Sequence, residues 1–170
     1  SPLKTNIFCS DFNLKNMKCL TKLFRCIFKG KKPCCGGCKK LVLNISEKDQ
    51  SILSAIDENI VVGKIHSIRP HTDPKVTKVQ VTETEIAPGK KVQILCGAAN
   101  IKPGQIVPVA TVGADLGGGF VISERAIRGE TSFGMICAKD ELGLEKETDG
   151  IWELAPSFES QLGKPVKDLV

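Results

Sequence analysis

The 170-residue sequence lacks any run of about 18 consecutive apolar residues, the length that a membrane-spanning helix requires. Its most hydrophobic stretches, Leu41 to Ile45 and Ile106 to Val112, are only as long as strands. Histidine occurs twice, and neither His66 nor His71 has a serine, cysteine or carboxylate arrangement that favours a catalytic pair. We therefore expect a soluble protein that is not an enzyme and needs no cofactor.

Acidic residues are nearly absent from the first 40 positions, which hold ten lysines and arginines but only Asp11, a net charge of +9. The other 130 residues hold 14 basic and 18 acidic residues, a net −4, so that the whole chain carries +5. We divide the chain into a basic, cysteine-rich arm (1–40), a linker with a helix (41–59) and a folded domain (60–170). Such an arm suits a polyanion, either nucleic acid or an anionic membrane surface.

Six of the eight cysteines lie in this arm, and they leave three interpretations open. Cys19, Cys26, Cys35 and Cys38 offer four thiolates for a zinc site, although their spacing is irregular. Cysteines interleaved with lysines and apolar residues also resemble an acylated membrane-contact segment. The third interpretation, a flexible basic arm with incidental thiols, is the one we adopt, so we predict no metal.

The arm and the linker each contain one segment with a helical pattern. We predict a short amphipathic helix around Met17 to Phe28, and a second helix that begins after Ser46. No clear signal peptide precedes the folded domain, so we expect a reducing, cytoplasmic environment.

Short β-branched runs separated by turns fill the sequence from Ile60 onward. Gly117 to Gly119 lacks the Lys-Ser/Thr pair and the following helix of a phosphate-binding loop, so we interpret it as a hairpin turn. Five short strands without long helices between them predict a mainly β fold, a small five-stranded barrel with short flanking helices. The strands are predicted at Ile60 to Ile68, Val76 to Thr84, Lys91 to Cys96, Ile106 to Val112, and Phe120 to Ile127 continued by Gly134 to Ala138.

Several motifs of the folded domain follow one another in a characteristic order: Gln93-Ile-Leu-Cys-Gly-Ala-Ala-Asn100, Pro103-Gly-Gln-Ile-Val-Pro-Val-Ala110, Arg128-Gly-Glu-Thr-Ser-Phe-Gly-Met-Ile-Cys137 and Glu141-Leu-Gly-Leu144. This order resembles the OB-fold tRNA-binding domain family, and most closely the domain near the N-terminus of the phenylalanyl-tRNA synthetase β subunit. The resemblance implies an OB barrel from about residue 60 onward and tRNA as its partner. Some free-standing members of the family dimerise.

Ser132-Phe-Gly-Met135 matches the family's Ser-x-Gly-Met motif. The resemblance implies that the Ser132 hydroxyl bonds a phosphate or a 2′-OH and that Met135 packs on a base or ribose. In the alternative interpretation, Met135 belongs to the core and Gly134 is a bulge residue. We expect the RNA-binding role for both side chains.

Lys75 and Lys78 follow a segment that departs from the family pattern. His71-Thr-Asp-Pro-Lys-Val76 is one residue shorter than the family's His-Pro-x-Ala-Asp-Lys-Leu and places Pro74 where the family has an aspartate. The two lysines are predicted to supply charge to backbone phosphates without reading sequence. The alternative is that they are simply solvated.

Arg125, Arg128 and Asn100 complete the predicted RNA-binding set. A guanidinium of either arginine can fork onto a phosphate, or pair with a nearby acid such as Glu130 or Glu124. Arg128 matches the arginine of the family's Leu-Arg-Gly. The amide of Asn100 can contact RNA or cap the turn in which it lies.

We therefore expect a non-catalytic module that recognises tRNA by its shape and backbone, with the arm adding a salt-dependent attraction. A homodimer and a synthetase are further predicted partners. Two alternatives remain: a fragment or accessory subunit of phenylalanyl-tRNA synthetase, and an adaptor tethered to a membrane by its arm whose barrel binds protein.

Overall fold

The computed structural model describes Leu43 and residues 45–170. The predictions for the arm, including the helix around Met17 to Phe28, the zinc site and membrane contact, concern residues outside this part. None of the helices among the described residues is long and apolar enough to cross a membrane.

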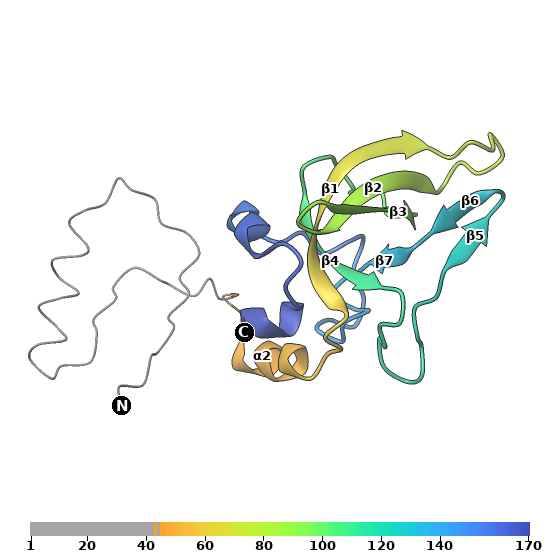
Figure 1. Ribbon diagram of the computed structural model, residues 1–170. Helices are drawn as coiled ribbons and strands as arrows, with labels where there is room; N and C mark the ends of the chain where they lie inside the picture. Colours follow the sequence, from red (N-terminus) through yellow and green to blue (C-terminus); the bar gives the residue numbers. More distant parts are fainter. Residues whose placement is uncertain (1–42, 44) are drawn as a thin grey trace, which may run out of the picture. The chain divides into compact units, whose positions relative to one another are not determined.

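Five antiparallel strands form one strongly bent sheet in the order β3-β2-β1-β4-β7 (Figure 1). Its strands are β1 (Ile60–Pro70), β2 (Gln80–Ala87), β3 (Lys90–Cys96), β4 (Ile106–Thr111) and β7 (Gly134–Ile136). A separate hairpin of β5 (Arg125–Ile127) and β6 (Glu130–Ser132) extends from the connection between β4 and β7. The predicted mainly β fold with a five-stranded barrel is confirmed.

Two predicted strands differ from the observed ones. The second begins at Gln80 rather than Val76, because residues 73–76 form a turn in which Val76 N donates to the Asp73 carbonyl at 3.0 Å. The last begins at Arg125 rather than Phe120, and an additional strand, β6, lies before its continuation in β7. Arg128 and Gly129, with positive φ angles of 44° and 90°, form the tight turn between β5 and β6. Sequence alternation shows neither the turn at residues 73–76 nor the additional strand β6.

The sheet closes into a barrel where β3 meets the β6–β7 strand. Phe133 N donates to the Gln93 carbonyl at 2.8 Å, which is a direct backbone contact between the two edges. Beside it, the Ser132 hydroxyl accepts from Leu95 N at 3.0 Å and donates to the Gly134 carbonyl at 2.9 Å. One side chain thus replaces a ladder hydrogen bond that the backbone alone does not make.

Two hydrophobic cores lie on opposite faces of β4, which is why nearly all of that strand is buried. Val107 and Val109 point into the barrel, and Ile106 and Ala110 alternate with them into a second core outside it. That outer core is covered by α2 (Glu47–Ser54) and by the short 3-10 helices η1 (Pro156–Gln161) and η2 (Val166–Leu169).

The predicted linker helix is confirmed as α2. Ser46 is its N-cap, and the serine hydroxyl accepts from Asp49 N at 3.2 Å, which satisfies one free donor of the first turn. Leu53 of this helix is fully buried in the outer core.

Close packing inside the barrel depends on the absence of a side chain at Gly63 of β1. A Cβ atom at this position would lie 2.6 Å from Val109 Cγ2 and 3.1 Å from the Glu85 carbonyl oxygen. The glycine therefore permits the strand to approach its neighbours on both sides.

We expect Gly63→Ala to lower the free energy of unfolding by about 1–3 kcal/mol, because the new methyl group overpacks the interior. Gly97→Ala is the matched control, since its nearest heavy atom would be the Lys78 carbonyl oxygen at 3.5 Å. Urea unfolding of both variants measures the difference. Equal stabilities would contradict this account of Gly63.

Candidate nucleic-acid interface

Two surface segments meet at one end of the barrel: the β1–β2 loop (residues 71–79) and the β5–β6 hairpin (Figure 1). In OB folds the loop between the first two strands and the loop before the last barrel strand flank the face that binds oligonucleotides. Here the hairpin is part of that second loop. The contacts between the two segments therefore determine the shape of the candidate interface.

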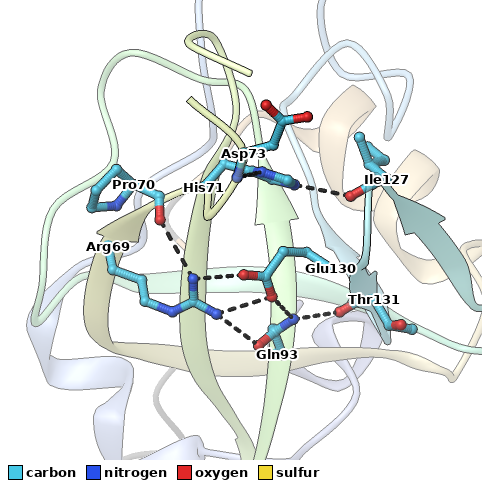
Figure 2. A network of polar contacts seen from close by, with 8 residues as sticks. All are labelled: Arg69, Pro70, His71, Asp73, Gln93, Ile127, Glu130 and Thr131. Carbon is cyan, nitrogen blue, oxygen red and sulfur yellow. Dashed lines mark hydrogen bonds and ion pairs between the residues drawn. The ribbon is translucent and has the colours of Figure 1, made fainter. Parts of the chain in front are cut away.

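The strongest contact is a bidentate ion pair between Arg69, at the end of β1, and Glu130 of β6 (Figure 2). Arg69 Nη1 donates to Glu130 Oε1 at 2.7 Å, and Nη2 donates to Oε2 at 2.9 Å. Gln93 of β3 joins them, since its Nε2 donates to Glu130 Oε2 at 3.0 Å and to the Thr131 carbonyl at 2.9 Å. Three strands are thus joined by one carboxylate.

The Glu130 carboxylate is held in its charged form. Hydrogen bonds from Arg69, and further ones from Thr72 and Gln93, lower its pKa from the ordinary 4.5 to about 2, against the opposing effect of desolvation. Its side chain is only 9% exposed, whereas that of Arg69 is 47% exposed. Removing one partner would leave a largely buried group without compensation.

His71 and Asp73 form a second layer of contacts between the two segments (Figure 2). The buried His71 ring donates through Nε2 to the Ile127 carbonyl at 2.9 Å and accepts at Nδ1 from Asp73 N at 2.9 Å. Asp73 Oδ2 then accepts from Arg128 Nη1 at 3.2 Å. We call the three contacts Arg69 with Glu130, His71 with Ile127, and Asp73 with Arg128 the loop clamp.

The acidic partners suggested for Arg128 from the sequence, Glu130 and Glu124, are not the ones it pairs with. Arg128 pairs with Asp73 of the β1–β2 loop, and Glu130 pairs with Arg69 instead. The Arg128 side chain remains 59% exposed. The hairpin turn directs Arg128 and Glu130 to different neighbours, so residue spacing alone does not identify the pairs.

Three of the predicted RNA-binding cations have no ion pair among the described residues: Lys75, Lys78 and Arg125. All three residues are exposed. Lys75 and Lys78 lie on the β1–β2 loop, and Arg125 begins β5. The clamp therefore joins the two segments that carry free positive charge.

Ser132 and Met135 lie at the barrel closure. Ser132 is 7% exposed, and its hydroxyl already bonds two backbone groups, so the geometry gives it a structural task. Met135 is half-buried on β7 opposite Ala110 and packs against the outer core. Gly134 is needed there because a Cβ would meet the Ala110 carbonyl oxygen at 2.8 Å. The RNA contact of Ser132 and Met135 stays a prediction.

Asn100 lies apart from the clamp. Its amide donates to the Ile151 carbonyl at 3.1 Å and accepts from Ile151 N at 3.0 Å, so both ends of the amide are engaged. This double contact ties the segment after β3 to the segment before η1. Its role in RNA binding also stays a prediction.

The described residues 45–170 contain no group of three His, Cys, Asp or Glu side chains that could hold a metal ion. Cys96 and Cys137 are both free and buried, and burial raises the pKa of the Cys137 thiol to about 12. A thiol in such surroundings is a poor nucleophile and a poor metal ligand.

Sequence reasoning missed Arg69, Gln93 and His71 as parts of the interface. Arg69 and Glu130 are 61 positions apart, and Gln93 reaches Glu130 across 37 positions. No periodic pattern connects residues at such separations. The one usable signal was His71, whose position matches the histidine of the family's loop motif.

We expect Glu130→Gln to reduce the stability of the protein at neutral pH and to flatten its dependence on pH. Because the pKa is lower in the folded state, Glu130 contributes stability above pH 4.5, and this contribution is lost as the pH falls towards 2. Thermal unfolding from pH 7 to pH 2 measures it. Glu124→Gln, at an exposed position between β4 and β7, is the control and should show the pH dependence of the wild type. If Glu130→Gln also showed the pH dependence of the wild type, the loop clamp would not contribute to stability.

Comparison with known proteins identifies the domain. A sequence model described as "Putative tRNA binding domain" matches residues 60–163. Phenylalanine–tRNA ligase β subunits are similar over the same region: that of Chlorobaculum tepidum is 43% identical over 114 residues, covering 65% of this chain and 14% of the relative. For Nitratidesulfovibrio vulgaris the identity is 45% over 101 residues, covering 59% and 12%.

The Chlorobium luteolum β subunit is 38% identical over 131 residues, which covers 75% of this chain and 16% of the relative. The chain thus spans only about a seventh of the length of these curated relatives. Among solved structures, the C-terminal domain of Plasmodium vivax p43 has a TM-score of 0.35 at 21% identity, covering 45% of this chain and 43% of that one, which supports no structural conclusion.

The matched residues make up more than half of the chain, and they coincide with the barrel and its loop clamp. The resemblance inferred from the ordered motifs is confirmed. The chain belongs to the tRNA-binding domain family and is homologous to the tRNA-binding part of the phenylalanyl-tRNA synthetase β subunit.

Proposed function

We propose that the barrel binds tRNA without catalysis and recognises its shape and backbone rather than its sequence. A domain of this family is a binding module without catalytic activity of its own. The observation that carries the proposal is the loop clamp, which joins two segments bearing exposed cations at the edge of the OB face.

Lys75, Lys78 and Arg125 are the proposed phosphate ligands. Each is exposed and has no carboxylate partner among residues 45–170, so its charge is available to a polyanion. Arg128 is proposed to exchange part of its contact with Asp73 for a phosphate, because its own side chain is 59% exposed and ion pairs at the surface contribute little stability. Contacts of this kind position RNA and contribute affinity that depends on salt.

The charge of the folded domain makes a second basic element necessary. Residues 41–170 carry a net −4, and residues 138–153 alone hold six acidic and two basic side chains. The arm carries +9 and is proposed to supply a general attraction to RNA. Its role rests on charge alone, since its residues lie outside the described part.

A second candidate is a role within a phenylalanine–tRNA ligase. The similar proteins favour it, since they are phenylalanine–tRNA ligase β subunits, of whose length this chain covers a small part. The catalytic step would then depend on other polypeptide segments, and a ligase subunit would be the partner. Co-purification with a phenylalanine–tRNA ligase tests this candidate; homodimerisation and a cytoplasmic location stay predictions.

We expect the double variant Lys75→Gln/Lys78→Gln to bind total tRNA more weakly and to reduce the slope of log affinity against log salt by about two, because each lysine neutralises one phosphate. Filter binding across a salt series measures both quantities. Lys48→Gln/Lys146→Gln removes the same charge from α2 and the acidic segment and should leave the slope unchanged. Identical slopes for both variants would exclude the lysines as phosphate ligands.

Deletion of residues 1–40 should weaken tRNA binding broadly and flatten its salt dependence further, because up to ten cationic groups are removed. The same salt series measures the change. Circular dichroism confirms that the barrel persists in the shortened chain. An unchanged affinity and slope would show that the arm has another task.

A further inference from the structure

A small apolar groove opens beside the barrel closure, with a volume of about 180 Å³. It lies between the connection from β4 to β5 and the strands β3 and β7. Apolar side chains of Leu95, Phe120, Val121 and Met135 line it, and Arg125 stands at its border. Drug-sized ligands and whole cofactors occupy pockets of about 300–1,000 Å³, so this groove suits a single small planar group.

The groove contains one of the two exposed phenylalanine side chains of the described domain. The sequence has no tyrosine, one tryptophan and seven phenylalanines, of which only three lie in the folded domain. Phe158 is buried, whereas Phe120 and Phe133 are 50% and 39% exposed. Phe120 lines the groove, whereas Phe133 is not among the residues that line it.

Phe120 is held in place by a tight hairpin. Phe120 N donates to the Gly117 carbonyl at 3.1 Å, and the Phe120 carbonyl accepts from Leu116 N at 3.0 Å. Ile122 exchanges two backbone hydrogen bonds at 2.8 Å with the segment 113–114. The backbone that carries Phe120 is therefore already ordered before a ligand binds, which lowers the ordering cost of binding.

Charge at the border selects the kind of occupant. Arg125 has no ion pair among the described residues, and its neighbour strand β6 is joined by the clamp to the lysine-bearing β1–β2 loop. A nucleotide combines a flat apolar base with a phosphate, which matches an apolar wall beside a free guanidinium. Bases stack readily on aromatic side chains of single-strand binding proteins.

We propose that this groove takes one unstacked base of the bound RNA, with Phe120 as the stacking surface and Arg125 contacting the adjacent phosphate. The proposal rests on the proposed function and adds a base subsite to it. The site is independent of sequence, because every base has a π-face. In addition to the phosphate contacts, such a subsite would favour single-stranded segments of tRNA over its helices, because only an unstacked base can enter the groove.

The test compares two single strands of about 12 nucleotides and equal phosphate number, an oligouridylate and its abasic counterpart, with the full chain as the binding protein. We expect the wild type to prefer the oligouridylate by about 5- to 150-fold. Phe120→Leu should remove most of this preference without changing the salt slope, and Phe120→Tyr should retain it. Val112→Ala, at another half-exposed apolar position outside the groove, is the matched control.

A preference that is equal in Phe120→Leu and in the wild type would overturn the base subsite. So would wild-type binding of both strands with equal affinity, although the proposed tRNA binding would then stand. Absence of binding to either strand and to tRNA would overturn both proposals. If Phe120→Leu instead reduces self-association in sedimentation and leaves RNA preference intact, the groove is a protein contact and the base subsite is excluded.

Discussion

Closure of the barrel between β3 and the β6–β7 strand is the constraint on which the remaining features depend. It includes the backbone hydrogen bond from Phe133 to Gln93, the Ser132 hydroxyl that bridges Leu95 and Gly134, and the Gln93 side chain, which donates to the Thr131 carbonyl. Because these contacts fix β6, they also fix the position of Glu130, the first residue of β6, and of the β5–β6 hairpin. Both the loop clamp and the apolar groove are built on strands that this closure holds together.

The loop clamp shows how a domain of net negative charge can present a face to a polyanion. Glu130 is the acid that lies deepest in the interface, and the guanidinium of Arg69 neutralises it at bidentate distance. The carboxylate therefore does not repel phosphates as a free charge would. Its burial and its pKa of about 2 also mean that the contact persists throughout the physiological pH range.

Preorganisation and charge have separate origins in this molecule. Neutral contacts and satisfied ion pairs define the shape of the loops, whereas exposed cations without partners supply the attraction. Residues 138–153 carry a net charge of −4, the same as the net charge of residues 41–170 as a whole. The difference in charge between this acidic segment and the lysine-bearing β1–β2 loop would accordingly orient a ligand that carries phosphates.

The sequence by itself determined the barrel, the helix after Ser46 and the family, because alternation, turn residues and ordered motifs are local signals. It also located the cations of the β1–β2 loop and the hairpin. Only the tertiary structure decided that Glu130 pairs with Arg69, that Ser132 closes the barrel, and that Phe120 borders a groove. The ion pair and the Ser132 contact join residues 61 and 37 positions apart, and the groove gathers side chains from β3, β7 and the connection between β4 and β5. No local pattern specifies which distant side chains a closed sheet brings together.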